Sequence, residues 1–326
     1  MQFIPRIFTI LAFLLVSISS LAQINQTDVD DFVRIYASQN HLALEDIEAI
    51  VSKATFQPSI IDKMTKPAEQ TMTWTRYRGL FLTDARIDEG IKFWAANETT
   101  LRQVSKQTGV SEEVILGIIG VETFFGTRAG SYSVLDALYT LAFGYPKRSA
   151  FFKAELGKFL ELCTRENLDP LSIKGSYAGA MGYCQFMPSS YLAYAKNFDQ
   201  QGSTDLMNNV DDAIASVANY IQVHRWQPGK PVVTKAIVTD SAKLPLAKQS
   251  VKPSESIKTY QNMGFQTADG SSTNEQVTLQ EFVLDEGSEY WFGFNNFYVI
   301  TRYNHSPLYA LAVYQLGEAI KTKKAN

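Results

Sequence analysis

A single carboxyl group interrupts the most apolar helical segment of the sequence, which makes it the first candidate for catalysis. Residues 115–126 read ILGIIGVETFFG, and Glu122 is the only acid among them. Counting by three and four, three isoleucines of this run share a helix face with Glu122. A carboxyl held among apolar groups has a raised pKa and can act as a general acid near neutral pH. The alternative is a structural carboxylate that reaches solvent or pairs with Arg128.

The flanking residues predict the helix that carries Glu122. Ser111 is a suitable N-cap, and two glutamates follow it in the first turn, where the helix dipole favours negative charge. Gly117 and Gly120 each weaken a helix by roughly 0.5–1 kcal/mol relative to alanine, so we expect another backbone to pack close to them. Gly126 is expected to end the helix.

A second segment with chemical potential spans residues 174–191, which read KGSYAGAMGYCQFMPSSY. Its glycines, alanines and Ser176 leave the backbone close to whatever lies above it, and Tyr177, Tyr183 and Gln185 offer hydrogen-bonding groups. This composition indicates a binding surface, with a glycine-rich packing loop as the alternative. Pro188 is expected to be the first residue of the next helix.

Metal and nucleophile chemistry have little support in the sequence. The chain has two cysteines, Cys163 and Cys184, and three widely separated histidines, so neither a zinc site nor a Ser-His triad is indicated. Residues 197–212 resemble a calcium loop, with Gly202 at the sharp turn. However, its first, fifth and twelfth positions are amides, Asn197, Gln201 and Asn208, which depletes the charge that calcium requires. We therefore expect no cofactor, and calcium is the one candidate left open.

The length, composition and net charge are those of an ordinary globular protein of several domains. The 326 residues are 45 % hydrophobic and 19 % charged, with a net charge of -3. No basic patch stands out, so nucleic acid is not an expected partner. Residues 1–22 have a positive n-region at Arg6, an apolar core and a small-residue cleavage site at 20–22, and this pattern predicts a cleaved secretory signal. No cysteine follows the site to carry a lipid, so the mature protein is expected to be exported and soluble.

The predicted elements suggest an α+β protein that is mostly helical. Helical periodicity covers residues 29–109, except for 73–78, which we interpret as a packed connection. Further helices are expected from Ser133, as a cap with Asp136 in the capping box, to 143, and over 150–165, 211–221 and 307–320. Alternating residues over 231–238 predict a strand. We expect an N-terminal helical domain (23–110), a core (111–228), a small β-containing domain (229–290), and an aromatic segment with a helix (291–326) that packs back on the helical part.

Five separated motifs resemble the lytic murein transglycosylase B family of periplasmic enzymes that cleave peptidoglycan. They are GVETFFG, YPKR, GSYAGAMGYCQFMPSSY, SVANY and FYVITRYNHSPLYALAV. The resemblance runs in order from residue 29 to 320. It implies a lysozyme-like core with a flanking helical domain, a small β domain and a long groove for glycan.

The resemblance also implies roles for individual residues. Glu122 matches the catalytic acid/base of the family, and Ser176 and Gln185 match side chains that hold the sugar beside the cut. Six more match groove positions: Tyr77, Arg148, Tyr220, Tyr303, Asn304 and Tyr309. The chain departs from the family at Lys147, Phe151 and Cys184, where arginine, tyrosine and glycine are usual.

The implied reaction uses one carboxyl group. Glu122 would protonate the oxygen between N-acetylmuramic acid and N-acetylglucosamine and then take the proton of the muramyl C6 hydroxyl, which closes on C1 to give a 1,6-anhydro end. Peptidoglycan glycan strands would be the substrate, other cell-wall enzymes are candidate partners, and a monomer is expected. The sequence leaves two alternatives open. One is a hydrolytic lysozyme with a second carboxylate, for which Asp136, Glu155 and Asp169 are candidates, and the other is a non-catalytic murein-binding protein.

Overall fold

The computed structural model describes residues 24–65, 72–239 and 250–326. Within these ranges the chain is a mostly helical α+β protein, as the sequence predicted. The expected export signal, residues 1–22, lies outside the described residues. Across the three described ranges, every helix is too short or too polar to cross a membrane.

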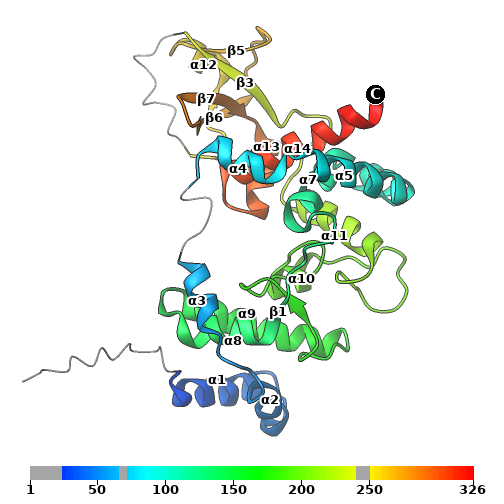
Figure 1. The fold of residues 1–326 in the computed structure, drawn as a ribbon, viewed down its shortest axis with the longest axis vertical. Helices are drawn as coiled ribbons and strands as arrows, with labels where there is room; N and C mark the ends of the chain where they lie inside the picture. The colour runs from blue at the N-terminus through cyan, green and yellow to red at the C-terminus, as the bar shows by residue number, and fades with distance from the viewer. Residues whose placement is uncertain (1–23, 66–71, 240–249) are drawn as a thin grey trace, which may run out of the picture.

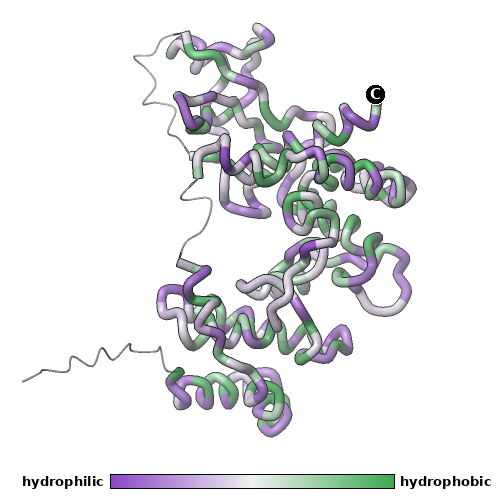
Figure 2. Tube along the Cα trace, in the orientation of Figure 1, coloured by the Kyte–Doolittle hydropathy of each residue, from purple (hydrophilic) through white to green (hydrophobic). Residues whose placement is uncertain are grey.

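The first three helices pack on a central helix pair. They are α1 (Gln26–Gln39), α2 (Leu44–Val51) and α3 (Pro58–Met64). The pair consists of α8 (Val134–Gly144) and α9 (Ser149–Arg165), joined by the 3-10 turn η2 (Pro146–Arg148). Hydrophobic and hydrophilic residues alternate along α1 in Figure 2, and its buried face forms one cluster with Tyr139 of α8 and Leu160 of α9. The predicted cap of α8 is confirmed, because Ser133 Oγ accepts from the Asp136 N–H.

The next helices belong to a different group (Figure 1). They are α4 (Trp74–Phe81), α5 (Asp84–Ala96) and α6 (Glu98–Thr108). They pack with α7 (Glu112–Thr123), α11 (Val210–Val223) and α14 (Pro307–Ala325). The helices expected between residues 23 and 110 thus have two sets of neighbours. The domain boundaries drawn from the sequence remain a proposal.

Helix α4 corrects one expectation, because residues 73–78 are not an irregular connection. Thr73 Oγ1 accepts from the Arg76 N–H and caps the helix. Trp74 and Tyr77, three residues apart, are both buried on one face, and the other face is exposed. A helix of eight residues with two apolar anchors is too short to show a clear period in the sequence.

Helices α7 and α14 cross at close range, and glycines make this possible. A Cβ on Gly117 would lie 2.2 Å from the Val313 backbone oxygen, and a Cβ on Gly317 would lie 2.2 Å from the Glu113 oxygen. The predicted backbone neighbour is therefore confirmed for Gly117. At Gly120 the space is filled by side chains instead, those of Phe125 and Leu316.

Helix α7 ends at Thr123, three residues before the expected Gly126. Phe124 and Phe125 adopt left-handed backbone angles, with φ of 50° and 57°, and Gly126 continues at 88°. Their N–H groups bond the carbonyls of Gly120 and Ile119, which closes the last turn. Phenylalanine rarely takes this conformation, so the helix end could not be read from residue type alone.

A loop region and one short helix lie between the pair α8–α9 and α11. Strands β1 (Tyr132–Ser133) and β2 (Lys174–Gly175) form a small antiparallel ladder, and α10 is Pro188–Tyr194. Pro188 is the first helical residue, as predicted. Helix α11 begins one residue before the expected Asp211 and continues to Val223.

The remaining strands form a five-stranded antiparallel sheet in the order β4-β6-β7-β3-β5. The strands are β3 (Val233–Val238), β4 (Glu255–Ser256), β5 (Phe265–Thr267), β6 (Gln276–Val283) and β7 (Ser288–Gly293), and α12 (Ile257–Gln261) packs beside them. The aromatic segment 290–303 is divided between β7 and α13 (Asn295–Tyr303). Helix α13 leads directly into α14, so the chain returns from the sheet to α7.

Candidate active site

Glu122 lies on the last turn of α7, and a buried tyrosine binds its carboxyl group. The Tyr309 hydroxyl, from the first turn of α14, donates a hydrogen bond to Glu122 Oε1 at 2.6 Å. Tyr309 is 2 % exposed, whereas Glu122 is half-buried. The protein therefore fixes one carboxyl oxygen while the group stays accessible from solvent.

The end of α7 connects this carboxyl to the glycine-rich segment. The Thr123 hydroxyl accepts from the Gly126 N–H at 2.9 Å and lies 3.3 Å from the Tyr183 carbonyl oxygen. Thr123 is fully buried. The sequence analysis did not single out this residue, although a threonine directly between the acid and the turn was a usable signal.

Tyrosines from distant parts of the chain form a cluster around Glu122. Tyr303 stacks on Tyr309 with ring centroids 6.4 Å apart, and Tyr220 contacts Tyr303 at 4.8 Å. The Tyr303 hydroxyl donates to the Cys184 carbonyl at 2.7 Å, and the Tyr220 hydroxyl donates to the Arg302 carbonyl at 2.6 Å. Three residues that the sequence marked, on α11, α13 and α14, thus meet beside the carboxyl.

Burial keeps these hydroxyl groups protonated. It raises the pKa of Tyr303 and Tyr309 well above the ordinary value, and the nearby Glu122 adds to the effect. Burial likewise raises the pKa of Tyr220 to about 12. Cys184 is fully buried, which raises the pKa of its thiol, and the charge of Glu122 raises it further. At neutral pH the tyrosines can donate hydrogen bonds but cannot act as bases, and the thiol is not a nucleophile.

The glycines of the segment 174–187 serve close packing inside the protein. A Cβ on Gly175 would lie 2.2 Å from the Ala180 oxygen, and a Cβ on Gly182 would lie 2.2 Å from the Leu206 oxygen. The segment folds on itself through paired backbone hydrogen bonds between Met181 and Phe186. For the glycines themselves, the packing alternative describes the structure better than open access to a ligand.

Ser176 and Gln185 are both engaged in holding this segment together. Ser176 Oγ accepts from the N–H groups of Ala178 and Ala180, and its own hydroxyl hydrogen is a further donor. Gln185, with φ of 48°, donates its side-chain amide to the carbonyls of Ala129 and Gly182 at 3.0 and 2.9 Å. Their predicted contacts with sugar stay a prediction.

The other predicted groove residues differ in their surroundings. Tyr77 is buried against Trp74 and Phe81, and it is near enough to Tyr309 to help raise the pKa of that hydroxyl. Asn304 follows the last residue of α13, next to Tyr303. Arg148 is exposed at η2, with its guanidinium over the rings of Phe151 and Phe152.

The three acids proposed as a second carboxylate all have structural hydrogen bonds. Asp136 accepts from the Thr55 N–H, and Asp169 accepts from the Leu171 N–H in a turn. Glu155 is 4 % exposed and accepts from the N–H and hydroxyl of Ser189, at the start of α10. None of these bonds involves the tyrosine cluster, so Glu122 is the carboxyl that the cluster surrounds.

The calcium-like loop is closed by its own amide groups. Asn197 Nδ2 donates to the carbonyls of Gln201 and Gly202, where a cation would draw on carbonyl oxygens. Asp212 accepts from the Phe198 and Asp205 N–H groups, and Asp199 accepts from the Gln201 N–H. Among the described residues, Asn197 Oδ1 is the one buried side-chain oxygen of this loop without a hydrogen-bond partner. Calcium takes six to eight oxygen ligands, so the residues present do not fit it well.

Comparison with known families gives one match along most of the chain. The sequence profile of the family described as "Transglycosylase SLT domain" matches residues 25–318. The chain is 38 % identical over 305 residues to the membrane-bound lytic murein transglycosylase B of Escherichia coli (strain K12), which covers 91 % of this chain and 83 % of that protein.

Solved structures agree with this family. Soluble lytic transglycosylase SltB1 from Pseudomonas aeruginosa matches with a TM-score of 0.85 and 43 % identity, over 91 % of this chain and 99 % of its own. Escherichia coli Slt35, solved in complexes with bulgecin A and with calcium, matches with a TM-score of 0.84 and 38 % identity, over 92 % of this chain and 94 % of its own. SltB3 from Pseudomonas aeruginosa, in complex with NAG-NAM-pentapeptide, matches with a TM-score of 0.79 and 27 % identity, over 90 % of this chain and 79 % of its own.

Proposed function

The chain belongs to the transglycosylase SLT family of lytic murein transglycosylases, and we propose from this premise that Glu122 alone serves as acid and base of the reaction. The fold is the lysozyme-like fold of these enzymes, and the substrate is peptidoglycan. The complex of SltB3 with NAG-NAM-pentapeptide supports a glycan strand that still bears its stem peptides.

The proposed reaction proceeds in two proton transfers. Glu122 gives its proton to the oxygen that joins N-acetylmuramic acid to N-acetylglucosamine, and the bond from that oxygen to muramyl C1 breaks. The 2-acetamido group of the muramyl ring stabilises the cation that forms at C1. The Glu122 carboxylate then takes the proton of the C6 hydroxyl, and the oxygen of that hydroxyl bonds to C1. The products are a free N-acetylglucosamine hydroxyl and a 1,6-anhydromuramyl end, and Glu122 is protonated again.

The observation that carries the proposal is the hydrogen bond from Tyr309 to Glu122 within the tyrosine cluster. It orients one carboxyl oxygen, and the clustered hydroxyls cannot replace Glu122 as a base because their pKa values are raised. The other candidate acids bind backbone N–H groups outside the tyrosine cluster. We assign sugar contacts to Ser176, Gln185, Arg148 and Asn304 by the same family resemblance.

Analysis of the products tests this function against hydrolysis. Purified peptidoglycan is digested with the protein, and the fragments are identified by mass spectrometry. Anhydromuramyl ends, 18 Da lighter than reducing ends by the loss of one water, are the expected result. Reducing muramic ends would instead require a water molecule activated by a second base.

We further propose that the protein works in the periplasm after removal of residues 1–22. The positive, apolar and small-residue regions of that segment support export. The measurement is the intact mass of the protein in the periplasmic fraction, which should correspond to a chain that starts at Gln23. A membrane-bound species that retains Met1 would contradict the proposal.

A further inference from the structure

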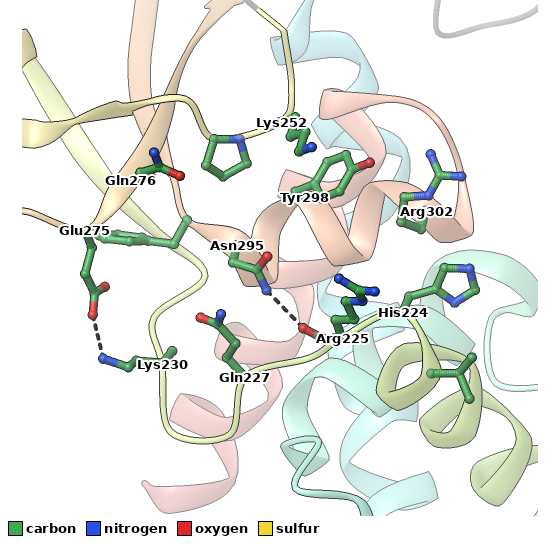
Figure 3. A pocket seen from close by; sticks show the side chains of 13 residues that line it. His224, Arg225, Gln227, Lys230, Lys252, Glu275, Gln276, Asn295, Tyr298 and Arg302 are labelled. Carbon is green, nitrogen blue, oxygen red and sulfur yellow. Dashed lines mark hydrogen bonds and ion pairs between the residues drawn. The ribbon is translucent and has the colours of Figure 1, made fainter.

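A cationic pocket lies beside the tyrosine cluster, at the junction of the helical core and the sheet (Figure 3). Its volume is about 720 Å³. We define it by His224 and Arg225 at the end of α11, Lys230, Lys252, Glu275, and Arg302 of α13. Four cations and one acid line this space, although the chain as a whole has a net charge of -3.

The acid neutralises only one of the four cations. Glu275 pairs with Lys230, with an N–O distance of 2.5 Å, as Figure 3 shows. Among the ion pairs formed within the described ranges, none includes Arg225, Lys252 or Arg302. The pocket therefore has an excess of positive charge, and an anion can enter it without displacing an acid.

The backbone at Arg225 is held in an unusual conformation. Arg225 has φ of 72°, a left-handed angle that costs energy for a residue with a side chain. The Asn295 side chain donates to the Arg225 carbonyl at 3.0 Å, and the Asn296 side chain accepts from the Gln227 N–H at 2.8 Å. Two residues at the start of α13 thus fix the turn that presents the arginine.

Aromatic contacts connect this pocket to the proposed catalytic group. His224, which lines the pocket, stacks on Tyr220 with ring centroids 4.1 Å apart. Tyr220 contacts Tyr303, and Tyr303 stacks on Tyr309, which binds Glu122. Arg302 lines the pocket with its side chain and accepts the Tyr220 hydroxyl with its carbonyl. The pocket and the catalytic site therefore share a wall.

We propose that the cationic pocket binds a carboxylate of the stem peptide carried by the muramyl residue. This inference rests on the proposed function, because the peptide is attached to the same strand that Glu122 cuts. The hydroxyl and acetamido groups of the glycan are neutral, so the charges that complement the pocket are on the peptide. A stem of five residues spans at most about 17 Å when extended, at roughly 3.4 Å per residue, which is enough to pass the three ring contacts.

The experiment removes two charges from the pocket without touching the tyrosine cluster. Arg225→Gln and Lys252→Gln are combined, since both side chains are exposed. Three soluble substrates are compared: glycan with native stem peptides, glycan whose peptide carboxylates are chemically amidated, and glycan that an amidase has freed of peptides and whose newly exposed lactyl carboxylates are also amidated. KM of the double variant should rise roughly 10-fold on the native substrate, as expected for lost hydrogen bonds to a charged group, with little change in kcat. On the other two substrates, variant and wild type should have equal KM.

A matched control removes two charges elsewhere. Lys106→Gln with Lys258→Gln takes the same charge from exposed helix positions outside the pocket, and KM should stay at the wild-type value. If the control raises KM as much as the pocket variant, the effect is one of overall charge and the inference fails. It also fails if the pocket variant changes KM equally on all three substrates.

The outcomes separate this inference from the proposed function. Wild-type protein that releases anhydromuropeptides from all three substrates, with pocket variants that behave like wild type, would disprove the peptide contact and leave the reaction intact. Wild-type protein that releases none from any substrate would disprove the function itself.

Discussion

At the scale of single residues, the position of Glu122 differs from that of the other acids considered. Asp136, Glu155 and Asp169 bind backbone N–H groups outside the tyrosine cluster, whereas Glu122 accepts a hydrogen bond from a side-chain hydroxyl of another helix. It lies on the last turn of an apolar helix, shortly before two left-handed phenylalanines. Such strained residues are often found where a functional group must be held in place.

Glu122→Gln is the most direct test of the catalytic assignment. The amide keeps nearly the same shape but cannot deliver or take a proton, so release of anhydromuropeptides should fall by at least ~10²- to 10⁴-fold. Folding should be unaffected, because Tyr309 can still donate to the amide oxygen. Fragment release at equal folded concentration is measured together with unfolding curves. Near wild-type activity of the variant would refute the role of Glu122.

Tyr309→Phe tests the orientation of the carboxyl. The phenyl ring keeps the stacking on Tyr303 but removes the donor 2.6 Å from Glu122 Oε1. The charged form of Glu122 then loses a hydrogen bond, so kcat should fall by roughly 10-fold, and the alkaline limb of the pH–rate profile, where the protonated acid is lost, should move to higher pH. Tyr298→Phe, at a half-buried position of α13 outside the tyrosine cluster, is the control. An unchanged profile in Tyr309→Phe would mean that the hydroxyl has only a packing role.

At the scale of elements, the crossing of α7 and α14 sets the positions of the Glu122 carboxyl and the Tyr309 hydroxyl. Gly117→Ala would bring a Cβ within 2.2 Å of the Val313 oxygen, so the helices would have to separate. Overpacking of this kind costs about 1–3 kcal/mol, and the melting temperature should drop by several degrees. Activity per folded molecule should drop as well, because Tyr309 moves with α14.

Gly79→Ala on α4 is the matched control, since an added Cβ there meets nothing within 4 Å. Alanine favours helix over glycine by roughly 0.5–1 kcal/mol, so this variant should be as stable as wild type or slightly more stable. A melting temperature of Gly117→Ala equal to that of Gly79→Ala would show that the crossing tolerates a wider spacing.

The same crossing contains an ion pair that makes stability depend on pH. Burial is the largest single influence and would raise the pKa of Glu113. The hydrogen bond and the charge of Lys321, together with hydrogen bonds from the Glu113 backbone and from Ser111, outweigh burial and lower this pKa, and Lys321 has a raised pKa in return. The stabilisation from Glu113 is present above its unfolded pKa of about 4.3 and is lost as pH falls through the lower folded value. The stabilisation from Lys321 is present below its unfolded pKa of about 10.4 and is lost as the pH rises through its higher folded pKa.

Glu113→Gln should therefore flatten the fall in melting temperature between about pH 5 and pH 3. Asp88→Asn is the control, because Asp88 and its partner Lys323 are each about half exposed, at 51 % and 47 %, and such surface pairs contribute little. Melting temperatures are measured across this range for both variants. Parallel curves for Glu113→Gln and wild type would assign the acid sensitivity to other groups.

Helices with a clear hydrophobic period could be predicted from the sequence, whereas contacts between segments far apart in the chain could not. The helices over 150–165 and 307–320 follow from their apolar spacing, and each begins within one residue of the expected position. Helix α4 was missed because only one face of eight residues is buried. The cationic pocket was missed because Arg225, Lys252 and Arg302 come from separate segments, so no basic run marks them in the sequence.

At the scale of the whole molecule, calcium should contribute little to stability. The amides of the loop 197–208 take the place of the acids that bind calcium, and Asn197 Nδ2 already serves the loop carbonyls. Thermal unfolding with millimolar calcium and with a chelator should give the same midpoint. A rise of several degrees with calcium would show that Asp199, Asp205 and Asp212 rearrange to bind it.

The hydrogen bond between Glu122 and Tyr309 joins residues 187 positions apart. A partner so distant along the chain is added only after a further 187 residues have been synthesised, and closing such a long loop costs conformational entropy and slows folding. A nascent chain that has not reached Pro307 thus contains Glu122 but lacks both the Tyr309 hydroxyl that binds it and the helix α14 that packs on α7. With Glu122 as the proposed catalytic group, we expect a copy of the chain that stops before Pro307 to lack lytic activity, because it has no α14.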